Sequence, residues 1–405
     1  MLVVVAATSA WAQPQKQPLV TGATYLHQFT APEDDGRNLG VKSSLSYSRF
    51  KALAVSEDSK FLYFACHDQN DNAANPPALA KLSIPGPGGV AAIVQPCTPM
   101  PNFAAISPGD LESGIKLAGA LEYQGKLIVT GTSFYDAGHS QEKSHWVCHT
   151  NLQNCTGPFR LSSARGKSES ALDRVGMQSR YMGLVPPEWR ALLGFPALTG
   201  MAGGQISIIH RQSYGPTITG FDPLKVGAPQ AIQMLIGYPD EEQRLGTWEE
   251  TTQYRATAGL KIGGFAWPTG SRSIVFIGSS GEEFCYGLGT DNKALHRKPV
   301  PDDAPWIYCH DPLQVGTKGG HPYPTIARLW FYDANDVLGV KARKRRPWDL
   351  KPTWVRMTGP VSETDQAPIH GAAYDQANNL LYIGIDEPTP RIFVYRLDYA
   401  RTPPG

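Results

Sequence analysis

The chain has 405 residues with 41 glycines, 34 prolines, 10% aromatic residues and only 18% charged residues. Disordered chains are rich in charge and poor in aromatic residues, and long helical bundles contain few glycines and prolines, so the composition excludes both classes. The many turn residues and aromatic residues favour a mostly β protein. Lys and Arg total 37 against 36 Asp and Glu, and this charge balance predicts no nucleic acid partner.

The first twelve residues predict a secretory signal peptide. An apolar run over residues 2–7 is followed by Ala10-Trp11-Ala12, which is the Ala-x-Ala pattern of a cleavage site. A buried first strand is the alternative interpretation. Because a membrane span needs about 18 apolar residues and no other run approaches that length, we expect no membrane span. The sequence therefore predicts one secreted or periplasmic domain over residues 13–405.

Five segments repeat one pattern, in which a stretch of small residues is followed by a polar turn and an apolar strand. The small-residue stretches are 50–56, 117–123, 181–187, 262–268 and 369–375, and the apolar strands are 61–66, 127–131, 191–195, 273–278 and 380–384. Third strands are recognisable at 327–333 and 391–398. Small residues suit the innermost strands of a β-propeller, which crowd around a central axis.

The repeats predict an all-β fold, a β-propeller with about five blades counted and up to seven possible. Residues 23–30 form a strand without a repeat of its own, and we expect it to supply the outer strand of the last blade and so close the ring. A β-sandwich is the alternative fold, but it does not predict five similar units.

Two insertions interrupt the predicted domain, near residues 238–255 and 285–325. The first is acidic and aromatic, and it is either a functional loop or a short outer strand with a solvated acidic turn. The second has little apolar content for its length, so it needs a metal or a covalent bridge to become ordered.

Six cysteines suit an oxidising compartment. Cys148 and Cys155 are close enough to join the two arms of one hairpin, and Cys66 and Cys97 fall in one repeat and could pair as well. The pairing of Cys285 and Cys309 is open.

The second insertion contains a possible structural zinc site. Two thiolates and two imidazoles make a closed tetrahedral zinc set, and the four residues of that kind are Cys285, His296, Cys309 and His321. The alternative is a Cys285–Cys309 disulfide with surface histidines, which export favours. We expect no other cofactor.

Cations recur three positions before the aligned small residue of four repeats, namely Arg49, Lys116, Arg180 and Lys261. In a propeller these positions gather at one mouth of the central channel, and converging cations favour an anionic ligand. The alternative is that each cation reaches solvent or pairs with a carboxylate of its own blade.

The second repeat also carries candidate proton-transfer residues, Tyr135 and His145. Near a cation that neutralises a carboxylate, such side chains can act as general base and general acid. The alternative is a polar blade edge with solvated histidines.

Four longer phrases suggest a relationship to known proteins: SRYMGLVPPEWRALLGFPALTG (179–200), SRSIVFIGSSGEEFCYG (271–287), GGHPYPTIARLWFYDANDVLGVKARKRRPWDLKP (319–352) and IHGAAYDQANNLLYIG (369–384). Together they resemble an uncharacterised group of secreted bacterial β-propeller proteins. The resemblance implies export and the propeller fold, and it carries no reaction. A looser similarity, in architecture only, is to the propeller-type lyases that cut acidic polysaccharides such as ulvan.

The sequence leaves two functions open for a secreted propeller whose partner is an anionic polysaccharide or another carbohydrate. The first is a polysaccharide lyase, in which the four cations bind the uronate carboxylate and His145 or Tyr135 moves protons. The second is a non-catalytic carbohydrate-binding or surface-assembly propeller that uses exposed Trp and Tyr as stacking platforms.

Overall fold

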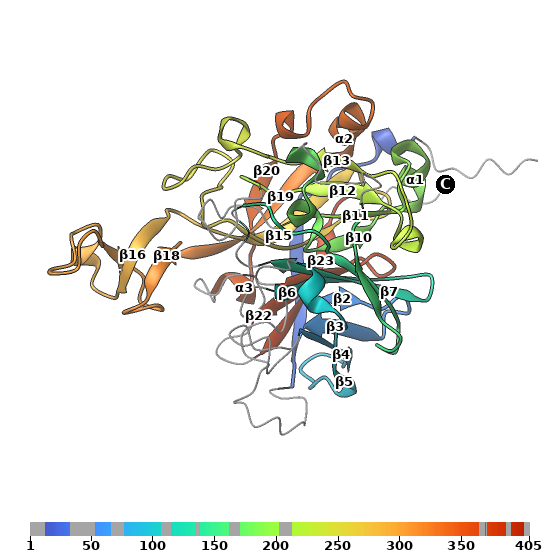
Figure 1. Cartoon of the computed structure of the whole chain (residues 1–405), viewed down its shortest axis with the longest axis horizontal. Coiled ribbons are helices and arrows are strands. Elements are labelled where there is room, and N and C mark those ends of the chain that lie inside the picture. Colours follow the sequence, from blue (N-terminus) through green and yellow to red (C-terminus); the bar gives the residue numbers. More distant parts are fainter. Residues whose placement is uncertain are drawn as a thin grey trace, which may run out of the picture.

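The structure is a computed structural model that describes residues 13–32, 53–65, 77–106, 115–133, 136, 138–161, 171–201, 213–363, 369, 371–385 and 390–400. Within these residues, five four-stranded antiparallel sheets make up the body of the protein (Figure 1). No helix in the described part of the chain is long and apolar enough to cross a membrane.

Each of the five sheets begins with one of the predicted small-residue stretches. The first three sheets are formed by β2 (Ala54–Val55), β3 (Phe61–Ala65), β4 (Ala78–Ser83) and β5 (Ile93–Pro99); by β6 (Ile115–Tyr123), β7 (Lys126–Ser133), β8 (His145–His149) and β9 (Thr156–Phe159); and by β10 (Met182–Leu184), β11 (Ala197–Thr199), β12 (Ile218–Phe221) and β13 (Gln233–Ile236). The last two are formed by β14 (Lys261–Ala266), β15 (Ser273–Gly281), β19 (Thr325–Asp333) and β20 (Thr353–Arg356), and by β21 (Gly371–Asp375), β22 (Leu380–Ile385), β23 (Arg391–Asp398) and β1 (Gly22–Thr30).

The last sheet combines the two ends of the chain. Strand β1 pairs antiparallel with β23, with Gly22 opposite Asp398 and Thr30 opposite Arg391. The strand predicted at residues 23–30 is therefore the outer strand of the last sheet, as the sequence analysis expected.

The innermost strands follow one another in a cyclic order. Strand β2 contacts β6, β6 contacts β10, β10 contacts β14, β14 contacts β21, and β21 contacts β2. Five clusters of buried apolar side chains follow the same order, and each fills the space between two neighbouring sheets. The sheets are therefore the blades of a β-propeller.

Glycine allows the innermost strands to approach one another closely. A Cβ atom on Gly119 of β6 would lie 1.8 Å from the carbonyl oxygen of Arg180, just before β10. A Cβ on Gly264 of β14 would lie 2.2 Å from the carbonyl oxygen of Ala372 on β21. Neither position can accept a side chain without moving a backbone, which is the physical basis of the small-residue pattern.

The middle strands are buried on both faces, which explains why they read as continuous apolar runs. On β15, Ile274 and Phe276 join the cluster shared with the third sheet, whereas Val275 and Ile277 join the cluster shared with the fifth. The alternation of a β-strand thus supplies two core clusters at once.

One predicted strand is wrong. Residues 191–195 were expected as the second strand of the third repeat, but they lie in and just after helix α1 (Pro187–Leu193), and β11 takes that place in the sheet. Pro187 starts the helix, Gly194 ends it in the left-handed conformation with φ 79°, and Trp189 and Leu193 bury one face. Two further helices are α2 (Ala334–Lys341) and α3 (Pro360–Glu363).

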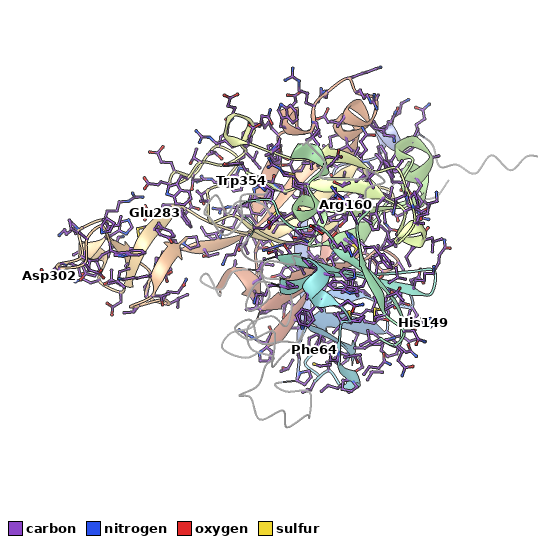
Figure 2. All side chains as sticks on the ribbon, viewed as in Figure 1. Phe64, His149, Arg160, Glu283, Asp302 and Trp354 are labelled. Atoms are coloured by element: carbon purple, nitrogen blue, oxygen red, sulfur yellow. A yellow bond between two sulfur atoms is a disulfide. The ribbon has the colours of Figure 1, made fainter. Side chains whose placement is uncertain are left out.

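The second insertion forms an arm that projects from the body (Figure 1). Its three-stranded sheet contains β16 (Cys285–Thr290), flanked by the parallel strand β17 (Tyr308–His310) and the antiparallel strand β18 (Lys318–His321). Figure 2 shows Glu283 along the arm and Asp302 at its tip. The first insertion contains the short 3₁₀ turn η6 (Glu241–Gln243), and its Trp248 packs against Phe284 beside the arm, with ring centroids 5.2 Å apart.

The disulfide alternative holds for the arm. Cys285 and Cys309 are bonded to each other across β16 and β17, with Cα atoms 5.7 Å apart. His321 lies between Asp311 Oδ2, 3.0 Å from Nδ1, and the Thr317 carbonyl, 3.1 Å from Nε2, while His296 Nδ1 accepts from a backbone N–H. The predicted zinc set of Cys285, His296, Cys309 and His321 is therefore corrected, because its two thiolates are consumed in the bridge. Among the described residues, no group of three or more His, Cys, Asp or Glu side chains is arranged to hold a metal.

The other cysteines follow the sequence prediction as far as the structure describes them. Cys148 and Cys155 form the predicted disulfide of the β8–β9 hairpin. Cys97 is also disulfide-bonded, and its predicted partner Cys66 lies outside the described residues.

We expect Gly119→Ala to destabilise the protein by about 3 kcal/mol, because the new methyl group collides with a backbone oxygen that cannot move without parting two blades. Urea unfolding measures the loss. Gly86→Ala is the matched control, since a Cβ there meets nothing within 4 Å. Equal stability of the two variants would contradict the close approach of β6 and the start of β10.

Replacing Cys285 and Cys309 together by alanine should increase amide hydrogen exchange across residues 285–321 and leave the five blades unchanged. The bridge closes a loop with a sequence separation of 24, so its loss frees the arm locally, by about 3 kcal/mol in the chain-entropy account. A chelator added to the wild-type protein should change nothing. Faster exchange in the arm after chelation would point to a metal and against the bridge.

Candidate functional site

Three of the four predicted cations lie where consecutive innermost strands begin. Lys116 is the second residue of β6, Arg180 precedes β10 by two residues, and Lys261 is the first residue of β14. Because β10 contacts both β6 and β14, these residues gather at one end of the central axis, here called the cation end. Arg49 lies outside the described residues.

The cations at this end differ in how far they reach solvent. Lys116 is only 3% exposed, whereas Arg180 and Lys261 are half-buried. Burial lowers the pKa of Arg180 to about 10. Burial and then the charge of Arg180 lower the pKa of Lys261, and the carboxylate of Asp311 opposes that shift. This electrostatic coupling indicates that Arg180 and Lys261 lie near each other at the cation end.

A buried amide lies next to these cations in the chain. Gln178 ends the 3₁₀ turn η4 (Val175–Gln178) and is 0% exposed, and among the described residues neither its side-chain nitrogen nor its side-chain oxygen has a hydrogen-bond partner. Leaving a buried polar group unsatisfied costs about 1–3 kcal/mol. A buried amide of this kind calls for a further polar partner, such as an ordered water or a bound polar group.

His145 occupies a different position from the one expected for a catalytic base. It is 0% exposed, its Nδ1 lies 2.7 Å from Ser144 Oγ, its Nε2 lies 3.4 Å from Thr199 Oγ1, and its ring packs against Phe221. Burial lowers its pKa to about 3. The imidazole is therefore neutral and enclosed between the second and third sheets. This enclosed position does not fit a proton-transfer residue open to substrate, because the third sheet covers this face of β8. Tyr135 lies outside the described residues.

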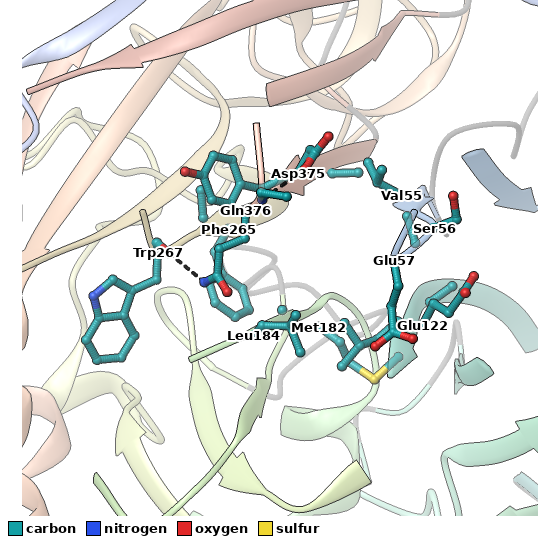
Figure 3. Close-up of a pocket in the computed structure, with 18 of the residues that line it drawn as sticks. Val55, Ser56, Glu57, Glu122, Met182, Leu184, Phe265, Trp267, Asp375 and Gln376 are labelled. Carbon is teal, nitrogen blue, oxygen red and sulfur yellow. Dashed lines mark hydrogen bonds between the residues drawn. The ribbon is translucent and has the colours of Figure 1, made fainter. Parts of the chain in front are cut away.

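The opposite end of the axis holds a cavity of about 310 Å³ (Figure 3). It is lined by the last residues of the innermost strands and the turns after them, among them Val55, Ser56, Glu57, Glu122, Met182, Leu184, Phe265, Trp267, Asp375 and Gln376. Gln376 donates to the carbonyl oxygen of Trp267 at 3.0 Å, which links the fourth and fifth sheets at the rim.

Two carboxylates of this cavity, Glu57 and Glu122, form hydrogen bonds that join neighbouring blades. Glu57 accepts from the backbone N–H of Gln124 and Gly125 at 2.7 and 3.2 Å, and Glu122 accepts from the Tyr63 hydroxyl at 2.5 Å. Both contacts join the first and second blades. These acids are not among the site residues predicted from the sequence, although an acidic residue at or just after the inner strand, in three of the five repeats, is a visible signal.

Comparison with known proteins adds no family to this description. No protein-family model matches the chain, and no curated protein matches its sequence. Among solved structures it is similar to a glycosyl hydrolase from Bacteroides ovatus, with 10% identity over 97% of this chain and 94% of that one, and a TM-score of 0.45.

Two further solved structures share the same distant likeness. One is described with the GH130 family of mannoside phosphorylases and glycoside hydrolases that target β-1,2 mannosidic linkages in Candida mannan, with 11% identity, 93% and 94% coverage and a TM-score of 0.44. The other is Trypanosoma rangeli sialidase, with 11% identity over 88% of this chain and 46% of that one, and a TM-score of 0.38. At these values the likeness does not bear on the reaction of this chain.

We expect the His145 imidazole to stay neutral at pH 5 in the folded protein, as observed by NMR of the ring nitrogens. Its folded-state pKa of about 3 lies below the unfolded value of about 6.5, so the unfolded state takes up the proton first. The stability that this group contributes is therefore complete above pH 6.5 and falls by about 2.5 kcal/mol between pH 6.5 and 4.5. A ring that titrates near pH 6.5 in the folded state would show that solvent and substrate can reach it.

Proposed function

We propose that this protein is an exported β-propeller that binds an acidic polysaccharide at the cation end of its central axis. The observation that supports the proposal is the placement of Arg180 and Lys261, two half-buried cations, where the innermost strands of neighbouring blades begin. A ligand carboxylate between them would relieve their repulsion and form charge-assisted hydrogen bonds. The neighbouring Gln178 amide would supply a polar partner for a ligand hydroxyl or carboxylate.

The overall charge favours a ligand with well-spaced negative charges. Proteins that bind nucleic acid carry a strong net positive charge, whereas this chain has a formal net charge of +1. A uronate polymer carries one carboxylate per sugar, which suits a compact pair of cations. The disulfides are compatible with the secreted or periplasmic location in which such polymers occur.

The described residues support a carbohydrate-binding protein better than a polysaccharide lyase. An eliminase needs a base open to the substrate, and His145 is enclosed and neutral. Lyase activity is therefore one possible outcome of the test below. If the protein is a lyase, its base would be a residue outside the described part of the chain, such as Tyr135.

Affinity electrophoresis in gels that contain polygalacturonate or alginate measures this binding. Arg180→Gln and Lys261→Gln should each weaken binding about tenfold, the loss of one charge-assisted contact of about 1.4 kcal/mol. Arg180→Lys should retain part of the affinity, and added salt should weaken binding in the wild type. Lys126→Gln is the matched control, because that exposed lysine begins β7 at the opposite end of the axis.

Two results would contradict the proposal. If both folded Gln variants were retarded by the acidic polymer as strongly as the wild type, the cation end would not be the binding site. Release of unsaturated, ultraviolet-absorbing products from either polymer would show an eliminase in place of a binding protein.

A further inference from the structure

The sheet of the arm has two chemically different faces. Tyr286 and Leu288 of β16 lie on one face, opposite Gly320 and Lys318 of β18. On the other face, Cys285 is bridged to Cys309 and is buried. The second face is therefore the interior of the arm, and the first carries its aromatic side chains.

Three aromatic rings form a row on the arm, here called the aromatic row: Trp248, Tyr286 and Trp306. The centroids of Trp248 and Tyr286 are 6.3 Å apart, and those of Tyr286 and Trp306 are 5.8 Å apart with the ring planes inclined by only 23°. Tyr286 is 42% exposed, although large aromatic side chains of a folded chain usually bury most of their surface.

Contacts with Phe284 and Lys318 hold two rings of the row in place. Phe284 packs edge-on against Trp248, and the ammonium group of Lys318 lies 5.0 Å from the centre of the Trp306 ring. Rings fixed in this way lose little conformational freedom when a ligand stacks on them.

The charged side chains around the row neutralise one another. Arg297 pairs with Glu249 at 3.2 Å and with Glu283 at 3.5 Å, and Lys318 pairs with Asp303 at 2.6 Å. All five are partly exposed, so they offer hydrogen-bond donors and acceptors to a ligand. Because the carboxylates are at least as many as the cations, this rim suits an uncharged partner and disfavours a polyanion.

We propose that the aromatic row is a second carbohydrate site, which takes an uncharged polysaccharide that stacks on the exposed Tyr286 and contacts the partly buried rings of Trp248 and Trp306 beside it. A pyranose ring has an apolar C–H face that fits an aromatic ring and an edge of hydroxyl groups that both donate and accept hydrogen bonds. The paired carboxylates and guanidinium of the rim match that edge. This site is independent of the cation end, since it uses other residues and a ligand of different charge.

The test uses affinity electrophoresis of the full chain in gels with soluble neutral polysaccharides: a β-glucan, a mannan, a xylan and a starch-type glucan. At least one polymer should retard the wild type, and Tyr286→Ala and Trp306→Ala should each weaken that binding about tenfold. Leu313→Ala is the matched control, since this exposed arm residue, 53% accessible, lies outside the row. The bound polymer should also shift the tryptophan fluorescence of the wild type, and the shift of Trp306→Ala at saturating polymer should be smaller because one ring of the row is missing.

The two proposed sites can fail separately. Arg180→Gln should bind the neutral polymer as the wild type does, and Trp306→Ala should retain binding to the acidic polymer. No retardation by any of the four neutral polymers, or an equal loss in Leu313→Ala, would overturn the aromatic row as a carbohydrate site. Concentration-dependent self-association that Trp306→Ala abolishes would overturn it as well, because the row would then be a contact between copies of this chain.

Discussion

The close approach of neighbouring innermost strands is the constraint on which the rest of this molecule depends. Gly119 faces the carbonyl oxygen of Arg180 and Gly264 faces that of Ala372, so two pairs of blades meet through backbone with no side chain between them. Each blade can then bury apolar side chains against both neighbours, and the core is divided into five clusters between sheets. The same approach brings the beginnings of β6, β10 and β14 together, which is why Lys116, Arg180 and Lys261 gather at one end.

As a result of that arrangement, cations lie at one end of the central axis and carboxylates at the other. Arg180 and Lys261 converge where the innermost strands begin, and Glu57, Glu122 and Asp375 line a cavity where such strands end. The two ends are not equivalent, because Glu57 and Glu122 make hydrogen bonds between the first two blades, whereas Arg180 and Lys261 place two cations where neighbouring innermost strands begin. This placement of charge is the basis on which we propose an anionic ligand at one end of a protein with almost no net charge.

The sequence was sufficient for features that local patterns determine. Small residues before polar turns located the five innermost strands, and the unrepeated strand at 23–30 located the outer strand of the last blade. Contacts made by a neighbouring sheet could not be predicted from the sequence. Nothing near His145 in the chain shows that Thr199 and Phe221 cover it. The spacing of Cys285 and Cys309 fits a zinc site and a bridge equally well, and Trp248 is too far from Trp306 in sequence for the aromatic row to be visible.

The central claim is that one acidic ligand group bridges two blades at the cation end. A crystal structure of the protein soaked with an oligouronate tests it most directly. The account predicts a sugar carboxylate within hydrogen-bonding distance of both Arg180 and Lys261, with the Gln178 amide satisfied by the same ligand. An oligouronate bound in the cavity at the opposite end, or a cation end that stays empty at saturating ligand, would contradict it.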